Sequence, residues 1–297
     1  MSRDGHQSIV EKLGLPEAVN FHVWRPCNMR CSFCFATYDS VMQRGSEDGL
    51  KGPAAVQVLN QLREAGFEKI TFAGGEPLLY PELDELLQQA RGLGFVVSLV
   101  TNGFLLDSSR ARDVAPLLDW LVLSIDSIND LTNRQIGRWV PRGGGTPLSG
   151  FLTASEIARD LGTRVKVNTV VTRFNSGEHL RPFVDQIGAT RWKVMRVLPI
   201  DGENDVGYRR TSVSQADFWA FVELNSSGRA DLHVVPEDHA DMYESYVMVD
   251  PLGRFLSNHN GRYSVSAAIL EVGVEEAVKS VVVDYGNFVG RGGHYDW

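Results

Sequence analysis

Six short runs of apolar and β-branched residues recur along the first two thirds of this chain, with amphipathic patterns between them. The segments PAAVQVLNQLREAG (53–66) and PELDELLQQARGLG (81–94) open with proline and close with glycine, as helices often do. Strand–helix alternation predicts a parallel sheet with right-handed crossovers, and six such units predict an α/β fold built as a partial (βα)6 barrel. The six expected strands are VNFHVW (19–24), KITFAG (69–74), FVVSLVT (95–101), WLVLSID (120–126), RVKVNTVVT (164–172) and RWKVMRVLP (191–199).

The alternation weakens after about residue 200, which divides the chain into three expected parts. These are a short N-terminal segment (1–18), a core barrel (19–200) and a C-terminal extension (201–297) that packs on the barrel. The stretch WVPRGGGTPLSG (139–150) is rich in glycine and proline, so we interpret it as a loop. The tail GGHYDW (292–297) is expected to be irregular.

Charge and hydropathy exclude several classes of function. The net charge is −8 and no run of Lys or Arg stands out, which argues against nucleic acid as a partner but leaves room for a small local basic pocket. No apolar stretch approaches the roughly 20 residues of a spanning helix, and the N-terminus lacks a signal-peptide core. We therefore expect a cytoplasmic protein with no membrane partner.

All three cysteines of the chain, Cys27, Cys31 and Cys34, lie in one segment, CNMRCSFC, directly after the first expected strand. An odd number of clustered thiols indicates a metal or redox site in a reducing compartment. A cubane iron–sulfur cluster normally takes four thiolates, so three would leave one iron open, and an open position is typical of a catalytic metal site. The alternatives are a zinc site completed by His22 or another distant residue, and a purely structural group of thiols.

The spacing Cys-x3-Cys-x2-Cys, with Phe33 before the last cysteine, resembles the radical S-adenosylmethionine (SAM) superfamily. The motif GGEP (74–77) follows the second strand, where that superfamily places the site for the SAM amino group. GGEP alone is also a common turn, in which Pro77 stops the strand. The two motifs in this order are far more specific than either one.

This resemblance implies a [4Fe–4S] cluster held by the three cysteines, with SAM chelating the open iron and yielding a 5′-deoxyadenosyl radical on reduction. Asn102 and Ser124 lie near the ends of the third and fourth strands, where the superfamily contacts SAM; turn or capping residues are the equal alternative. The residues implied to bind the cofactor are Phe35, Gly74, Gly75, Glu76, Asn102, Ser124 and Arg138.

A closer resemblance, to viperin-like enzymes, covers nearly the whole chain from about Asn20. It rests most on RWKV (191–194) and VGVEEA (272–277), which are not general radical SAM motifs, and also on NFHVWRPCNMRCSFCF (20–35), LSIDS (123–127) and RGGHYDW (291–297). The family implies 3′,4′-dehydration of a nucleoside triphosphate, usually CTP but also UTP or GTP. Its product is a 3′-deoxy-3′,4′-didehydro nucleotide that ends viral RNA synthesis, and an electron donor such as a flavodoxin or ferredoxin is implied.

Basic residues in the expected strands offer a test of this substrate. Arg191 and Lys193 point to one face of their strand and Trp192 to the other, because side chains alternate with period two. Each cation alone could be a solvated strand end, but as a set that matches the family they predict a triphosphate site. The implied substrate residues are Asn20, Lys69, Lys166, Asn168, Arg191, Lys193 and Tyr246.

Tyr246 and His22 are the implied catalytic residues, although each alone would be an ordinary packed or hydrogen-bonded core residue. The resemblance further implies that the C-terminal extension helps to close the nucleotide site. There are departures from the family. The long amphipathic N-terminal helix of animal members is missing, and GRYSVSAAIL (261–270) lacks their lysine, for which Arg262 could substitute.

Two other functions stay open. A radical SAM enzyme that acts on a peptide or another small metabolite is disfavoured, because peptide-modifying members commonly carry auxiliary clusters and no cysteine follows Cys34. The other is a non-catalytic interaction protein with a structural metal site.

Overall fold

A computed structural model describes residues 7–43 and 47–297. Its ten strands form one sheet in the order β10-β9-β8-β1-β2-β3-β4-β5-β6-β7. The strands are β1 (Ala18–Trp24), β2 (Lys69–Gly74), β3 (Val96–Thr101), β4 (Trp120–Ser124), β5 (Arg164–Val171), β6 (Arg191–Arg196), β7 (His233–Glu237), β8 (Val247–Val249), β9 (Arg254–Ser257) and β10 (Ser264–Ala268).

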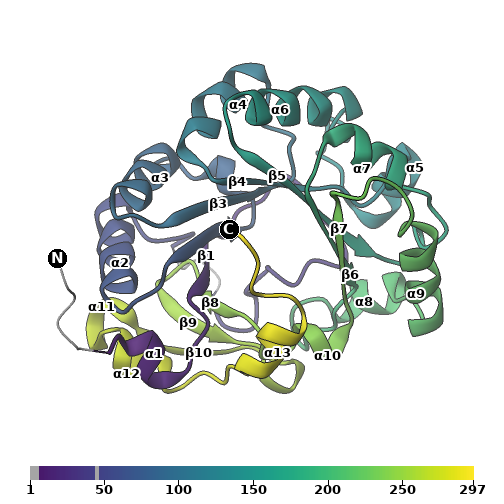
Figure 1. Ribbon diagram of the computed structural model, residues 1–297. Helices are drawn as coiled ribbons and strands as arrows, with labels where there is room; N and C mark the ends of the chain where they lie inside the picture. Colours follow the sequence, from purple (N-terminus) through teal and green to yellow (C-terminus); the bar gives the residue numbers. More distant parts are fainter. Residues whose placement is uncertain (1–6, 44–46) are drawn as a thin grey trace.

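Strands β1 to β7 run parallel and in sequence order, and the sheet curves into a ring with helices on its outside (Figure 1). All six expected strands are present, so the predicted α/β barrel with a C-terminal extension is confirmed. The helices are α1 (Ile9–Leu13), α2 (Gly52–Glu64), α3 (Leu83–Gly92), α4 (Ser108–Val114), α5 (Asp130–Ile136), α6 (Leu148–Asp160), α7 (Arg181–Ile187), α8 (Asp205–Thr211), α9 (Gln215–Leu224), α10 (His239–Met242), α11 (Ile269–Val272), α12 (Val274–Val278) and α13 (Tyr285–Gly290), with single 3-10 turns at η1 (Pro77–Leu79), η2 (Ala115–Leu117) and η3 (His259–Gly261).

Two boundaries differ from the sequence expectation. Helix α6 begins at Leu148 with Pro147 before it, so the last three residues of the expected loop 139–150 are helical. That part of the prediction was wrong, because proline just before a helix favours its start. The sixth strand ends at Arg196 rather than at 199, where Pro199 has no N–H to offer a sheet ladder.

The residues after 200 add strands to both edges of the sheet. β7 pairs with β6 in parallel, while β8 pairs in parallel with β1 at the opposite edge and continues into antiparallel β9 and β10. The division of the chain at residue 200 stays a prediction. The first six residues of the expected N-terminal segment lie outside the described residues.

Side chains along each strand alternate between the hydrophobic core outside the ring and the interior of the ring. Phe21, Phe72 and Trp192 are fully buried in the hydrophobic core. Arg191 and Lys193 both line a cavity inside the ring, so the expectation that they share a face opposite Trp192 is confirmed. The Trp192 indole N–H donates to the Thr169 hydroxyl over 2.9 Å, which satisfies this buried polar group.

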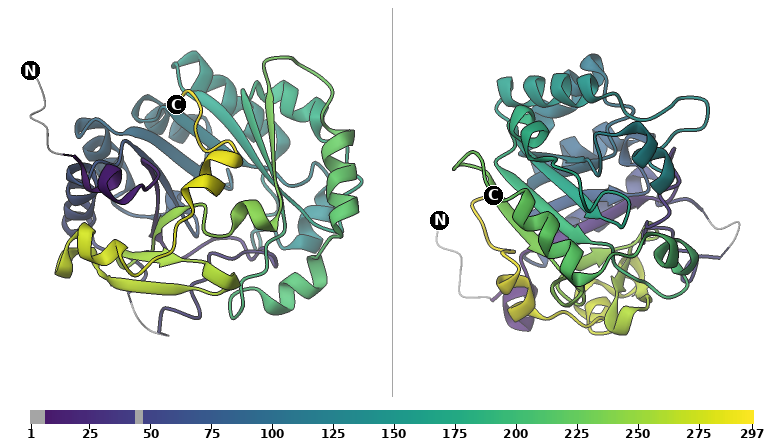
Figure 2. Two further views of the ribbon diagram at one scale, coloured as in Figure 1. Left: turned by 60° about the horizontal axis from the view of Figure 1, so that its bottom comes forward. Right: turned by 90° about the vertical axis from the view of Figure 1, so that its right-hand side faces the viewer.

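The C-terminal tail is irregular, as expected, and runs from α13 across one end of the ring (Figures 1 and 2). Its Tyr295 ring lies 4.1 Å from the Lys69 ammonium and 4.0 Å from the Arg191 guanidinium. The tail therefore reaches the interior from the amino ends of β2 and β6. None of the helices in the described residues has the length and apolarity needed to span a membrane.

Candidate active site

A cavity of about 290 Å³ fills the interior of the ring toward the carboxyl ends of the strands. Its wall includes all three cysteines, the GGE of the GGEP motif and the polar ends of β3 and β4. Most of the predicted site residues line it: Asn20, His22, Cys27, Cys31, Cys34, Phe35, Gly74, Gly75, Glu76, Asn102, Ser124, Arg138, Lys166, Asn168, Lys193 and Tyr246. Side chains from distant parts of the sequence thus meet in one place.

The cysteine loop is held by the backbone at the C-terminal end of α5. The Arg30 amide donates to the Gly137 carbonyl over 3.1 Å, and the Ser32 amide donates to the Ile136 carbonyl over 2.8 Å. A Cβ on Gly137 would lie 2.0 Å from the Arg30 carbonyl oxygen, and the φ of Gly137 is +81°. This position therefore requires glycine for both reasons.

The GGEP motif abuts the start of the same loop. The Gly75 amide donates to the Trp24 carbonyl over 2.7 Å, and the Glu76 amide donates to the Pro26 carbonyl over 2.9 Å. A Cβ on Gly75 would lie 2.3 Å from the Pro26 oxygen. The two glycines thus let the end of β2 approach the cysteine loop closely.

The buried Glu76 carboxylate holds this turn against the end of β3. It accepts hydrogen bonds from the Thr101 hydroxyl (2.7 Å), the Asn102 amide (2.8 Å) and the Leu78 amide (3.1 Å). Burial raises the pKa of Glu76, and these donors oppose the rise. The structure therefore shows the turn-holding role of Glu76, while a hydrogen bond from Glu76 to SAM stays a prediction.

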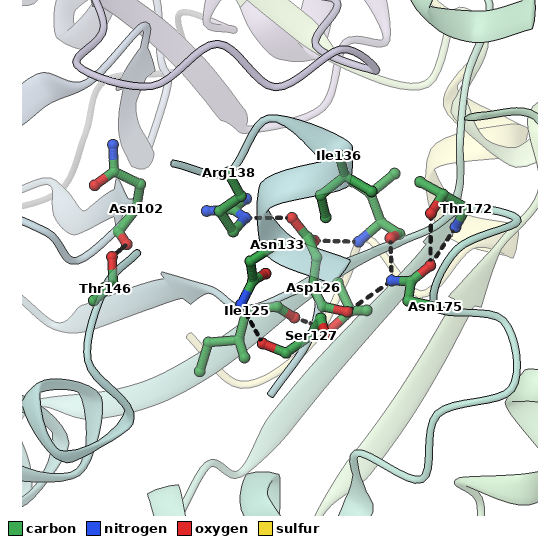
Figure 3. A network of polar contacts seen from close by, with 12 residues as sticks. Asn102, Ile125, Asp126, Ser127, Asn133, Ile136, Arg138, Thr146, Thr172 and Asn175 are labelled. Carbon is green, nitrogen blue, oxygen red and sulfur yellow. Dashed lines mark hydrogen bonds and ion pairs between the residues drawn. The ribbon is translucent and has the colours of Figure 1, made fainter. Parts of the chain in front are cut away.

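Arg138 enters the cavity from the residues after α5 and is fixed by Asp126 (Figure 3). Its Nε donates to Asp126 Oδ2 over 2.5 Å, and Asp126 Oδ1 accepts from the Val170 amide over 2.8 Å. One guanidinium nitrogen of Arg138, Nη1, is buried and has no partner among the described residues. Sequence reasoning named Arg138 but missed Asp126, although it lies within the quoted stretch LSIDS.

Asn102 plays a local structural role in addition to lining the cavity. Its side-chain amide donates to Asn28 Oδ1 over 2.7 Å, its Oδ1 accepts from the Phe104 amide over 2.9 Å, and its carbonyl accepts from Thr146 (Figure 3). Both interpretations of Asn102, turn residue and cavity residue, therefore agree with its position.

The donor set of the cysteine loop fits an iron–sulfur cluster. Burial raises the pKa of Cys31 to about 12 and that of Cys34 to about 11, so without metal both remain protonated. No three metal-binding side chains among the described residues stand close enough to hold a single ion. Three thiols in the wall of one cavity suit a cubane, in which each thiolate binds a different iron.

A smaller pocket of about 60 Å³ adjoins the cavity at the amino-terminal halves of the strands. Its basic side chains are Lys69, Lys166, Arg191, Lys193 and Arg291. The residues common to both walls are Asn20, Thr71, Lys166, Lys193, Tyr246 and Tyr295. The cation pocket and the cysteine cavity are therefore direct neighbours inside the ring, with these six residues between or beside them.

Two guanidinium groups in this pocket carry unused donors. Arg191 and Arg291 are each only 9% exposed, and the Nε of each is buried with no partner in the described part of the chain. Their other nitrogens donate to the Gly292 carbonyl over 2.6 Å and the Ser245 carbonyl over 2.8 Å. A buried charged donor without an acceptor is costly, which favours an anionic ligand here.

Burial lowers the pKa of the lysines in this pocket, and neighbouring cations add to the effect. Burial, together with neighbouring cations, lowers the pKa of Lys69 to about 6 and that of Lys166 well below its usual value. Burial also lowers the pKa of Lys193 to about 8, an effect that Glu237 opposes. An incoming polyanion would favour the protonated forms.

His22 lies on β1 with its ring in the cavity wall and its Nδ1 paired with the Tyr38 hydroxyl. Burial lowers the pKa of His22 to about 4, so the ring is neutral near pH 7. Arg262, in contrast, lines neither cavity and pairs with Asp201 at the surface. The substitution of Arg262 for the missing lysine therefore finds no support in this geometry.

The sequence led us to expect that the C-terminal extension helps to close the nucleotide site, but it did not single out the residues that reach the cation pocket. Arg291 and Tyr295 line it, and Glu237 lies directly behind it. The quoted stretch RGGHYDW contains the first two, and its arginine was the available signal. Nothing in the local pattern around Glu237 distinguishes it from an ordinary strand-end carboxylate.

Residues 22–187 match the radical SAM superfamily. The chain belongs to this superfamily. It is 41% identical over 281 residues to an S-adenosylmethionine-dependent nucleotide dehydratase of Flammeovirga pacifica, covering 94% of this chain and 96% of the relative. It is also 35% identical to the dehydratase RSAD2 of Oncorhynchus mykiss, covering 95% of this chain and 81% of the relative. These identities place it in the family of SAM-dependent nucleotide dehydratases.

Solved structures agree on the radical SAM fold. SuiB of Streptococcus suis bound to S-adenosylmethionine superposes with a TM-score of 0.64 at 18% identity, covering 81% of this chain. The chain spans only 59% of the length of SuiB, and at this identity the likeness concerns the fold alone. Membership of the superfamily implies SAM and a [4Fe–4S] cluster, with Cys27, Cys31 and Cys34 as the cysteine ligands.

Proposed function

We propose that this radical SAM enzyme dehydrates a nucleoside triphosphate to its 3′-deoxy-3′,4′-didehydro analogue, an antiviral chain terminator. CTP is the first candidate substrate, with UTP and GTP as alternatives. The family supports a nucleotide substrate, since the relatives are described as nucleotide dehydratases. The observation that carries the triphosphate is the pocket of five basic side chains with unpartnered guanidinium donors, next to the cysteine cavity.

The two ends of the ring have different roles in this proposal. When bound, the reduced cluster and SAM supply the 5′-deoxyadenosyl radical that removes a hydrogen atom from the substrate. The cations at the amino ends hold the triphosphate, so the ribose is directed into the interior, toward the cysteine loop. Such a radical is indiscriminate, and selectivity must come from this positioning.

Two asparagines in the cavity wall can hydrogen-bond to the nucleoside part of the substrate. Asn20 and Asn168 both line the cavity, and the Asn168 Oδ1 is buried without a partner among the described residues. A free amide oxygen accepts a hydrogen bond from a ribose hydroxyl or a base amino group. At the other end of the cavity, the unpartnered Nη1 of Arg138 suits the SAM carboxylate.

Tyr246 and His22 are the proposed catalytic side chains. Lys193 Nζ donates to the Tyr246 hydroxyl over 2.6 Å, and that hydroxyl donates to Glu237. These two hydrogen bonds run from Lys193 through Tyr246 to Glu237 and fix the Tyr246 side chain in the cavity wall, beside the proposed nucleotide site. Neutral His22 supplies an uncharged hydrogen-bonding group, not an acid.

The test is to offer CTP, UTP, GTP and ATP separately to the reconstituted, reduced enzyme with SAM. We expect one of them to stimulate 5′-deoxyadenosine formation and to yield a nucleotide lighter by one water, with cytidine as the control that lacks phosphates. Lack of stimulation by any triphosphate would contradict the proposal, and stimulation by a peptide would favour the alternative function. We further propose a flavodoxin or ferredoxin as electron donor and, from the reduced thiols, a cytoplasmic location.

A further inference from the structure

Glu237 is the last residue of β7 and is completely buried, with 0% of its surface exposed. It lines neither the cysteine cavity nor the cation pocket. It nevertheless contacts three residues of the cation pocket wall from behind. A fully buried carboxylate is expensive unless its partners compensate it, so these contacts decide its role.

Its two oxygens are fully engaged. Oε1 lies 2.7 Å from Lys193 Nζ and 3.3 Å from Arg291 Nη1, and Oε2 accepts from the Tyr246 hydroxyl. Lys193 also donates to the Tyr246 oxygen over 2.6 Å. An ammonium has three donors, so Lys193 keeps one N–H for a ligand in the pocket.

The surrounding charges are strongly unbalanced. The groups that face Lys193 are Glu237 on β7, Arg191 on β6, Lys166 on β5, Lys69 on β2, Arg291 after α13, and the hydroxyls of Tyr246 and Tyr295. Among the described residues Glu237 is the carboxylate in contact with these cations. Without it, the cations would repel one another in a desolvated site, and the lysines would lose their protons more easily.

We propose that Glu237 is a positioning residue for the triphosphate: it holds the Lys193 ammonium and the Arg291 guanidinium in place at the pocket wall and fixes the Tyr246 hydroxyl beside them. This inference rests on the proposed function for the identity of the ligand as a nucleoside triphosphate. That Glu237 supports the binding of an anion in the pocket does not depend on the proposed function. Glu237 acts through other residues and does not touch the ligand itself.

The proposal has a signature in pH dependence. The carboxylate raises the pKa of Lys193 against the effect of burial. Glu237→Gln removes this support while keeping the shape, so Lys193 deprotonates at a lower pH in the free pocket. Anion affinity of the variant should then equal or exceed that of the wild type at pH 6, where Lys193 is charged in both proteins, and fall below it as pH rises.

The experiment titrates the SAM-loaded holoenzyme with inorganic tripolyphosphate and with CTP between pH 6 and 9. We expect the affinity ratio of wild type to Glu237→Gln to grow about tenfold by pH 8.5, since each unit of pKa shift is a factor of ten in protonation. Glu237→Asp retains the charge and should retain the wild-type pH profile. Asp185→Asn, which removes the carboxylate that pairs with Arg181 on α7, is the control. It should change the affinity for neither tripolyphosphate nor CTP.

A uniform loss of affinity at every pH in Glu237→Gln would overturn the proposal, since it would indicate a packing defect. If this variant does not fold, Lys193→Met/Glu237→Gln is compared with Lys193→Met, because removing both partners of a buried pair is better tolerated than removing one. The two should have parallel pH profiles, and a further loss confined to high pH would contradict the action through Lys193. A wild type that binds tripolyphosphate but does not convert CTP would refute the proposed function and leave this inference standing.

Discussion

Gly207 of α8 packs directly against the backbone carbonyl of Ser32 in the cysteine loop. A Cβ built on Gly207 would lie 1.6 Å from that oxygen. The neighbouring Asn204 side chain donates to the Phe33 carbonyl over 2.9 Å. The segment after β6 thus supports the second half of the cysteine loop, just as the C-terminal end of α5 supports the first half.

Gly207→Ala is therefore expected to displace the cysteine loop. A contact this short forces backbone to move, since neither the carbonyl nor the helix is flexible. We expect loss of iron and of the cluster absorbance from the purified protein, together with a lower melting temperature. The control is Gly150→Ala on α6, where a Cβ has open space around it. This variant should keep the full cluster because it displaces nothing, and alanine is favoured over glycine in a helix. Normal iron content in Gly207→Ala would contradict the close packing.

The cysteines themselves give a second prediction. Cys27→Ala, Cys31→Ala and Cys34→Ala should each abolish reductive SAM cleavage, because the loss of one thiolate leaves a second iron without a protein ligand. The measurement is 5′-deoxyadenosine formation after anaerobic reconstitution, alongside iron analysis. Near-normal turnover by any one of the three would refute its assignment as a ligand.

The sequence was sufficient for the barrel and for the cavity at its carboxyl ends. Each predicted strand is rich in apolar residues on at least one face, and a one-residue error in register would have put Trp192 into the polar interior. The same alternation correctly placed Arg191 and Lys193 on one face. The motifs near the cysteines are local in sequence, so their spacing alone could indicate the site.

The other half of the site depends on contacts that no local pattern reveals. Arg291 lies 54 residues from Glu237 in the sequence, and the pairing of β8 with β1 carries Tyr246 to the pocket. The carboxylate that supports the cations looks like any strand-end glutamate. Its role appears only when the tertiary structure brings β6, β7 and the C-terminal segment together.

Glu76→Ala tests the GGEP turn. The substitution removes the acceptor for Thr101, Leu78 and the Asn102 amide, leaving buried donors unpaired at a cost of about 1–3 kcal/mol each. We expect SAM affinity, measured by calorimetry on the reconstituted protein, to fall at least tenfold and the melting temperature to drop. Glu85→Ala on the exposed face of α3 is the control. An unchanged SAM affinity would mean that the turn tolerates the loss.

Nucleotide binding should take up protons. In the free pocket the pKa of Lys69 is lowered to about 6 and that of Lys193 to about 8, so near pH 7.5 Lys69 is largely neutral and Lys193 partly so. A bound polyanion raises both pKa values, so affinity falls as pH rises from 6 to 9. Calorimetry in two buffers of different ionisation enthalpy measures the uptake, and Lys69→Met should reduce it. Equal uptake by wild type and Lys69→Met would contradict the neutral state of Lys69.

The triphosphate site is tested most directly by removing one cation at a time. Charge-assisted hydrogen bonds contribute roughly 1.5–3 kcal/mol each, and 1.4 kcal/mol is a factor of ten, so each loss should weaken CTP binding about ten- to a hundredfold. Lys166→Ala is the cleanest of these variants, because Lys166 has no hydrogen-bond or ion-pair partner among the described residues that its loss would expose. Arg191→Ala and Lys193→Ala also release the Gly292 carbonyl and Glu237, respectively.

The control for this series is Lys279→Ala, which removes an exposed lysine from the end of α12 and should leave CTP affinity unchanged. The cluster spectrum should stay intact in every variant, since the cations lie at the opposite ends of the strands from the cysteine loop. Cytidine separates charge from shape: its affinity should be weak in the wild type and change little in the variants, because it has no phosphate to lose. If the wild type binds and converts cytidine as well as CTP, these cations do not hold a triphosphate, and the dehydratase proposal loses its main structural support.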